Sequence, residues 1–144
     1  MESPSESDVR QSAENGDVAS MMQLAGILYM RQELPEAETW LRRAAQLGDS
    51  VALSNLGAML STQDPEQAER YLREAAAAGE AIAMYNLSVV LKDHSHGEAM
   101  TWLLKAAQRG YQPAMYELAD RLKDLRASEA QRWLALATRV SPDG

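Results

Sequence analysis

The sequence predicts an all-α protein, an α/α solenoid of four helix–turn–helix repeats with a 31-residue period. Three observations support this prediction. Glycines recur every 31 or 32 residues, leucines follow each glycine by eight and twelve positions, and an aromatic–leucine–alanine pattern precedes three of the glycines. Spacings of four and eight place apolar side chains on one face of a helix. No segment alternates polar and apolar residues with period two, so we expect no strand.

The repeats are defined by short motifs that recur in register. The glycines are Gly16, Gly48, Gly79 and Gly110, and the leucines that follow them are Leu24, Leu28, Leu56, Leu60, Leu87, Leu91, Leu118 and Leu122. The preceding pattern, Ala-x-x-Trp-Leu-x-x-Ala-Ala-x-x-Gly, spans residues 37–48 and recurs at 68–79, with Tyr for Trp, and at 99–110. A fourth copy begins at Ala130 and has Ser141 in place of the glycine. Each repeat is therefore one helix–turn–helix unit.

Local signals set the helix boundaries. Asp17 and Asp49 are candidate N-caps, and the repeat glycines suit the left-handed position that ends a helix. Pro35 lies at a first helical position, and the segment from Ser95 to Glu98 has the pattern of a capping box. The expected helices lie near 17–30, 35–47, 50–61, 65–78, 80–92, 97–109, 112–124 and 128–139.

The two chain ends differ from the repeats. Residues 1–12 read as a polar acidic tail that carries a helical stub near 8–15, because Val9 and Ala13 occupy the places of Leu41 and Ala45. We expect the solenoid over residues 13–140 and a second tail over 141–144. The stub would cover the first repeat, as terminal units of solenoids do.

Composition and charge exclude several classes of protein. The absence of cysteine excludes disulfides and thiolate zinc sites. A formal net charge of −7 argues against nucleic acid and against anionic membranes as partners. No apolar run approaches the roughly 18 residues of a membrane span, and the acidic N-terminus is unlike a secretory signal. We expect a cytoplasmic protein, unless a signal was removed upstream.

The sequence offers no catalytic residues, no cofactor site and no metal site, so we predict that the protein is not an enzyme. His94 and His96 lie beside Asp93 and Glu98, but we interpret this segment as a solvated loop with a capping serine rather than a metal site. An aromatic series recurs in register with the packing alanines, so we interpret it as structural wedging rather than a stacking platform. Its members are Trp40, Tyr71, Trp102 and Trp133.

The combined pattern, with the following Ala-x-x-x-Leu-Gly-x-x-Leu of residues 52–60, resembles the Sel1-like repeat family, relatives of tetratricopeptide repeats. The resemblance covers about residues 13–140. The 31-residue unit is shorter than the family's usual unit, and the fourth repeat lacks its glycine. The resemblance implies a right-handed α/α superhelix that holds other proteins along a concave face.

If the family geometry applies, the first helix of each repeat lines that face. The candidate groove residues are Met22, Tyr29, Asn55, Tyr85, Asn86, Tyr116 and Glu117. Asn55 and Asn86 match the asparagine that hydrogen-bonds a bound peptide's backbone in related tetratricopeptide grooves, and an amide suits this because it both donates and accepts. The alternative is that the asparagines satisfy a neighbouring helix and the tyrosines complete the packing.

We predict a module that binds a protein or peptide partner noncovalently, as an adaptor or scaffold. One alternative is an inhibitor or immunity-type protein that blocks a basic target, which the acidic charge would suit. Another is a structural homo-oligomer. Leu136 and Val140 are spaced by four near the C-terminus, where no capping helix follows, so they are candidate contacts of a two-fold homodimer through the last repeat.

Overall fold

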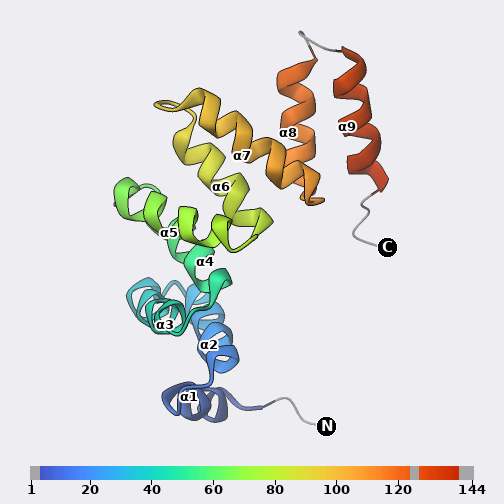
Figure 1. The fold of residues 1–144 in the computed structure, drawn as a ribbon. Coiled ribbons are helices and arrows are strands. Elements are labelled where there is room, and N and C mark those ends of the chain that lie inside the picture. The colour runs from blue at the N-terminus through green and yellow to red at the C-terminus, as the bar shows by residue number, and fades with distance from the viewer. Residues whose placement is uncertain (1–3, 124–126, 140–144) are drawn as a thin grey trace. The chain divides into compact units, whose positions relative to one another are not determined.

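The computed structural model describes residues 4–123 and 127–139, and these residues form helices without any strand. The helices are α1 (Glu6–Glu14), α2 (Val18–Met30), α3 (Leu34–Gln46), α4 (Ser50–Leu60), α5 (Pro65–Ala77), α6 (Ala81–Leu91), α7 (His96–Gln108), α8 (Gln112–Leu122) and α9 (Ala127–Arg139) (Figure 1). The pairs α2–α3, α4–α5, α6–α7 and α8–α9 correspond to the four predicted repeats. The all-α prediction and the helix–turn–helix period are confirmed.

Helix α1 begins at Glu6, two residues before the predicted stub. Ser5 caps the helix: its Oγ accepts the Asp8 N–H at 3.2 Å, and the Asp8 carboxylate accepts the Ser5 N–H at 3.0 Å. This reciprocal capping satisfies two N–H groups that would otherwise lack partners. Val9 and Ala13 are buried, as their match to repeat positions predicted.

The helix-ending glycines have the left-handed backbone that the sequence predicted, with φ between 87° and 98°. Asp17 and Asp49 cap the following helices, each accepting a backbone N–H at 2.8 Å. The capping box predicted at Ser95 is wrong. Ser95 is the N-cap of α7 but makes no side-chain cap bond; the Glu98 carboxylate accepts the Trp102 indole N–H at 3.3 Å.

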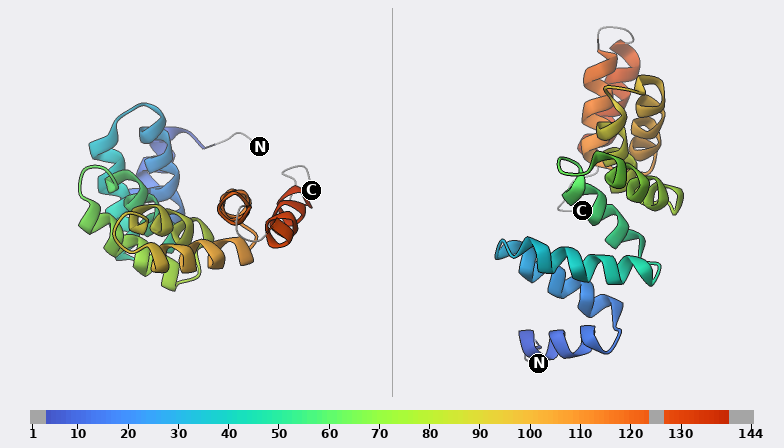
Figure 2. Two further views of the ribbon diagram at one scale, coloured as in Figure 1. Left: turned by 90° about the horizontal axis from the view of Figure 1, so that it is seen from above. Right: turned by 90° about the vertical axis from the view of Figure 1, so that its left-hand side faces the viewer.

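Contacts divide the chain into two compact units, residues 1–74 and 75–144, with the boundary inside α5. In the N-terminal unit, α1 packs on α2, α2 on α3 and α3 on α4 (Figure 2). Its core is apolar and draws on all four helices through Val9, Ala13, Met21, Leu24, Ala25, Leu28, Ala37, Trp40, Leu41, Ala44, Ala52 and Leu56. The recurring alanines and leucines of the sequence motif therefore supply the packing.

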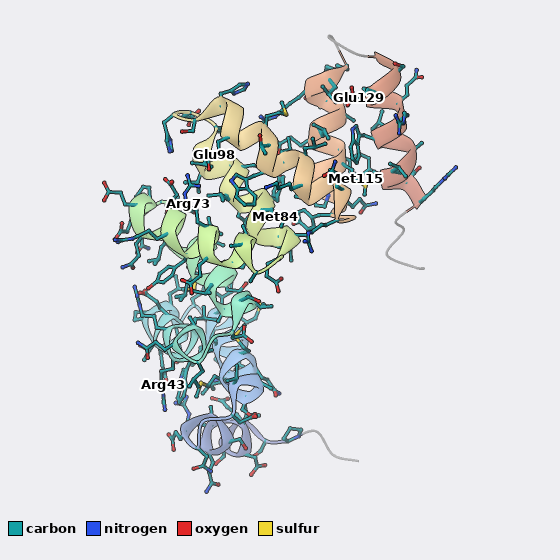
Figure 3. The ribbon with its side chains drawn as sticks, in the orientation of Figure 1. Arg43, Arg73, Met84, Glu98, Met115 and Glu129 are labelled. Atoms are coloured by element: carbon teal, nitrogen blue, oxygen red, sulfur yellow. The ribbon has the colours of Figure 1, made fainter. Side chains whose placement is uncertain are left out.

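The C-terminal unit repeats the same packing, with α6 against α7, α7 against α8 and α8 against α9. Leu87, Leu91 and Leu103 are fully buried, and Met84 and Met115, both labelled in Figure 3, are nearly so. The small residues along these helices are also fully buried, so neighbouring helices approach closely where they lie. These residues are Ala99, Ala106, Ala114 and Ala137.

Candidate functional site

The N-terminal unit contains an open cavity of about 310 Å³ between the first helices of two successive repeats. Helix α2 contributes four wall residues, α4 three, and Leu41 of α3 lies between them. The lining residues are Met22, Ala25, Gly26, Tyr29, Leu41, Asn55, Ala58 and Met59. The walls are mostly apolar, and the Asn55 amide and the Tyr29 hydroxyl are the polar side-chain groups among them.

The cavity is open because Gly26 has no side chain. Gly26 lies in the middle of α2, and a Cβ atom built on it would meet no atom of another helix within 4 Å. Glycine inside a helix costs stability relative to alanine, because it loses more backbone freedom on folding. Packing gives no reason for a glycine at this position, since the space beside it is free. Its effect is to keep the cavity open.

A second cavity, of about 480 Å³, continues the first, because Tyr29, Ala58 and Met59 line both. It extends past the α2–α3 turn, where Gln32 and Pro35 form part of the wall. The remaining lining residues are Leu34, Glu38, Leu60 and Gln63. We call the two cavities together the N-terminal groove.

The structure brings three of the predicted groove residues together in this unit. Met22, Tyr29 and Asn55 all line the first cavity; Tyr29 is 51% exposed and Asn55 is exposed. The Asn55 side chain forms no hydrogen bond with any other described residue. Its amide therefore does not satisfy a neighbouring helix within residues 4–123 and 127–139, which was the structural alternative for this asparagine.

The other predicted groove residues lie in the C-terminal unit and form a different arrangement. Tyr85 is half-buried, donates its hydroxyl hydrogen bond to Glu117, and packs its ring against Tyr111 with centroids 5.3 Å apart. Burial first, and then the Glu117 carboxylate, raise the pKa of the Tyr85 hydroxyl. Glu117 also accepts a hydrogen bond from Arg121. Tyr85 and Glu117 thus have structural partners.

Tyr116 and Asn86 differ from Tyr85 and Glu117 in their side-chain hydrogen bonding. Tyr116 is 44% exposed, and Asn86 is half-buried. Neither side chain hydrogen-bonds another residue in the part of the chain that the structure describes. They remain candidate contact residues.

The aromatic series has structural partners at three of its members. Trp40 is 5% exposed and lies under the guanidinium of Arg43, 4.6 Å from the ring centroid; Figure 3 labels Arg43. The Tyr71 hydroxyl accepts a hydrogen bond from Arg42 at 2.6 Å. The Lys105 ammonium lies 4.4 Å from the centroid of Trp102. These cation–π and hydrogen-bonded contacts agree with a packing role.

A third cavity, of about 390 Å³, lies in the C-terminal unit beside Trp102. Lys105 and Arg109 line it, and the Arg109 guanidinium donates a hydrogen bond to the Gly79 carbonyl at 3.2 Å. Ala76, Ala77, Met84 and Gln108 complete its wall. Lys105 therefore already contacts the Trp102 ring, and Arg109 already bonds a carbonyl oxygen.

The sequence pattern did not single out every residue of the groove. Leu41 and Met59 were not expected there, because fixed positions of the first helices defined the predicted face and neither residue occupies one of them. Gly26 is itself the sequence signal that points to the cavity, because its counterpart in the next repeat, Ala58, carries a Cβ atom. Ser54, the counterpart of Met22 in the next repeat, is 3% exposed and faces the interior.

The predicted dimer contacts lie at the C-terminal end of the chain. Leu136 of α9 is 41% exposed, whereas Val140 lies outside the described residues. Leu134 is exposed to a similar extent, 42%.

Neither a metal cluster nor a membrane span is found in the described ranges. No group of three or more His, Cys, Asp or Glu side chains there has the geometry to hold a metal ion, and His94 and His96 are both exposed. No helix within residues 4–123 and 127–139 combines the length and the apolar character needed to cross a bilayer.

Comparison with known proteins identifies the repeats. The Sel1 repeat family matches residues 50–80 and 81–111, and a tetratricopeptide repeat family matches residues 18–48. No curated protein sequence matches the chain significantly. The matched segments cover well over half of the chain.

Solved structures agree with the family matches. A Sel1 repeat protein from Oxalobacter formigenes is 26% identical with a TM-score of 0.83, over 94% of this chain and 64% of that one. A protective antigen of uropathogenic Escherichia coli with an SLR fold is 23% identical with a TM-score of 0.84, over 93% of this chain and 33% of that one. The chain therefore spans less than two thirds of the length of either protein.

A more distant structure is an immunity protein from Pseudomonas aeruginosa, 23% identical with a TM-score of 0.65 over 92% of this chain and 55% of that one. Repeats of this kind typically serve as non-enzymatic scaffolds for protein–protein interaction. The family matches, the four helix pairs and the solved structures together show that the chain belongs to the Sel1-like repeat family, with a tetratricopeptide-like α/α solenoid fold.

Proposed function

We propose that the protein is an interaction module, an adaptor or scaffold, that binds a peptide segment of a partner protein in the N-terminal groove. The observation that carries the proposal is the open cavity of about 310 Å³ at Gly26. A cavity of this volume accommodates a large apolar side chain, and burying such a side chain contributes about 1.5–3 kcal/mol. Catalysis has no part in the proposal.

The walls suit a partner side chain of more than one shape. Met22 and Met59 line the cavity, and both are half-buried. Methionine is unbranched and flexible, so methionine-lined surfaces repack around different apolar ligands. Tyr29 adds a large exposed ring with a polar tip, which is a common composition for residues that dominate binding energy.

Asn55 supplies the polar part of the site. Its amide lies at the cavity wall without a hydrogen-bond partner among the described residues, so it is available to both donate to and accept from a peptide backbone. We expect Asn55→Ala to weaken binding of a selected peptide by about tenfold, which corresponds to a hydrogen bond of about 1.4 kcal/mol.

The test is selection of binders from a random dodecapeptide display library on the wild-type protein, followed by measurement of the enriched peptides by fluorescence anisotropy. Gly26→Phe fills the cavity with a side chain that meets open space, so it should abolish peptide binding while the melting temperature stays close to wild type. Gly97→Phe is the matched control. Gly97 is also helical, and a Cβ added to it would likewise meet no atom within 4 Å, but it lies in α7.

Two results would contradict the proposal: no enrichment of peptides by the wild-type protein, or enriched peptides that bind Gly26→Phe as tightly as wild type. Loss of binding in Gly97→Phe to the same degree would also contradict it, because that residue is remote from the groove in sequence and lies in the other unit.

One observation favours a second candidate function, an inhibitor of a toxin or enzyme. A protein of similar fold is described as an immunity protein. This candidate would bind a folded target instead of a peptide segment. Neutralisation of a co-expressed toxin encoded beside the gene would support this candidate. If Gly26→Phe neutralises the toxin as well as wild type does, the inhibitor does not use the N-terminal groove.

A further inference from the structure

The formal charge of the protein is divided unequally between its two units. Residues 1–74 contain thirteen acidic and six basic residues, whereas residues 75–144 contain eight of each. The N-terminal unit therefore accounts for the whole net charge of −7, and it contains no lysine. The groove lies in this strongly acidic unit.

The arginines of the N-terminal unit are mostly engaged with its own side chains. Within the described residues, four of the six form ion pairs inside the unit: Arg10 with Glu36, Arg31 with Glu6, Arg42 with Glu38 and Arg73 with Glu69. Arg43 lies over the Trp40 ring. An approaching ligand consequently meets an excess of carboxylates.

The acidic character reaches the groove itself. Glu38 lines its second cavity while paired with Arg42, and the exposed Glu33 lies in the chain between the lining residues Gln32 and Leu34. Neither Lys nor Arg is among the described residues that line the two cavities. A cationic group bound beside Gln32 and Pro35 would be attracted by the Glu33 carboxylate at short range, with Glu38 partly offset by Arg42, and by the field of the whole unit at longer range.

We infer that the partner segment is a cationic peptide. It places a large apolar side chain in the first cavity, beside Gly26, and Lys or Arg side chains along the second cavity, beside Glu33 and Glu38. The inference rests on the proposed function and names the chemistry of its ligand. The apolar cavity supplies burial, while the unequal charge accelerates encounter and rejects acidic segments.

The display selection also tests this inference. The probes are the dodecapeptide library, and then the most enriched sequence as a synthetic peptide with a counterpart in which every Lys and Arg is replaced by Glu. The selected pool should be enriched in Lys and Arg together with Leu, Met or aromatic residues. The counterpart should bind at least about tenfold more weakly, and raising NaCl from about 50 to about 300 mM should weaken binding of the selected peptide several-fold.

Charge variants of the protein locate the effect. Glu33→Gln combined with Glu38→Gln should weaken the selected peptide by about three- to tenfold and flatten its salt dependence. Glu14→Gln, at an exposed position of α1, removes a negative charge from the same unit outside the groove lining, and should change the affinity by less than about twofold. If Glu14→Gln weakens binding of the peptide as much as the Glu33→Gln, Glu38→Gln double variant does, only the net charge of the unit matters. That result would overturn the placement of the peptide's Lys and Arg side chains beside Glu33 and Glu38.

The outcomes separate this inference from the proposed function. Selected peptides that are neutral or acidic, and that lose binding in Gly26→Phe, would overturn the cationic ligand and leave the groove as the binding site. Cationic peptides that bind Gly26→Phe unchanged would overturn both, because adhesion to an acidic surface would then explain them.

Discussion

Two helical glycines of the N-terminal unit have opposite surroundings. A Cβ at Gly57 of α4 would overlap Leu72 Cγ and lie 3.2 Å from the Ala68 carbonyl oxygen, and Leu72 is fully buried. Gly57 is therefore required by the close approach of α4 and α5. Gly26 has no such neighbour within 4 Å, so the same residue type serves packing at one position and leaves a cavity at the other.

We predict opposite effects of alanine at these positions. Gly57→Ala should destabilise the protein by about 1–3 kcal/mol, because the crowded Leu72 and the backbone of α5 cannot move freely. Gly26→Ala should stabilise it by about 0.5–1 kcal/mol through the better helix propensity of alanine. Urea denaturation followed by circular dichroism measures both; a destabilised Gly26→Ala would refute the assignment of open space beside α2.

At the scale of elements, the α2–α3 turn differs from the α4–α5 and α6–α7 turns, in each of which two successive N–H groups bond the same carbonyl. Helix α2 ends with the Gln32 N–H bonded to the Tyr29 carbonyl and the Glu33 N–H bonded to the Leu28 carbonyl, the same pattern that Gly48 and Asp49 form after α3. Gln32 occupies the glycine position of this motif with φ of 64°, the one positive φ of a non-glycine residue in the described ranges.

Gln32→Gly should therefore raise the stability of the protein. The left-handed conformation costs a residue with a Cβ roughly 1 kcal/mol, and glycine adopts it without that cost. Gln32→Val should have the opposite effect, since branching at Cβ makes this conformation worse. Thermal denaturation of the two variants should bracket the wild-type midpoint; the reverse order would contradict the observed turn.

Helix α1 is attached to the first repeat by ion pairs as well as by Val9 and Ala13. Arg10 Nη1 lies 2.6 Å from Glu36 Oε1, and Arg31 Nη2 lies 2.5 Å from Glu6 Oε2. The hydrogen bond from Arg10, with the nearby guanidinium charge, lowers the pKa of the Glu36 carboxyl below its ordinary 4.5. These side chains are between 33% and 52% exposed, so each pair adds little by itself.

The lowered pKa gives the attachment a pH dependence of known sign. A carboxyl with a lowered pKa in the folded state stabilises the fold above its unfolded pKa, and this contribution disappears as the pH falls through the folded value. The melting temperature of wild type should exceed that of Glu36→Gln at about pH 7, and the gap should close as the pH falls below the ordinary pKa of 4.5. A gap that stays constant down to about pH 2.5 would contradict the role of the ion pair.

At the scale of the whole molecule, the chain presents exposed apolar residues on α9. Leu134 and Leu136 are 42% and 41% exposed. An apolar helix face in a repeat array favours association when no neighbouring helix packs on it. The homodimer inferred from the sequence remains a prediction.

Leu136→Lys should convert such a dimer into a monomer without loss of helical signal, because a partly exposed leucine contributes little to the core and a lysine cannot be buried in an apolar two-fold contact. Sedimentation velocity of wild type and variant over a wide concentration range provides the measurement. A wild-type protein that stays monomeric throughout would eliminate the dimer.

The helices and their order were predictable because the same motif recurs in each repeat. Each copy carries the same glycine, alanine and leucine positions, and local rules for caps and turns place the boundaries of the repeat helices to within about two residues. Two predictions about helix N-termini differ from the structure. The Ser5–Asp8 box begins α1 earlier than expected, and Ser95 has no capping bond although its sequence fits one.

The sequence by itself determined the fold class, the repeat register and the family, because these depend on periodic patterns that neighbouring residues carry. It also singled out Met22, Tyr29 and Asn55. Only the tertiary structure decided that they share a cavity, that Gly26 opens it, and that Tyr85 and Glu117 bond each other instead. The physical reason is that a cavity is space left between helices, and that space depends on how helices distant in sequence pack together.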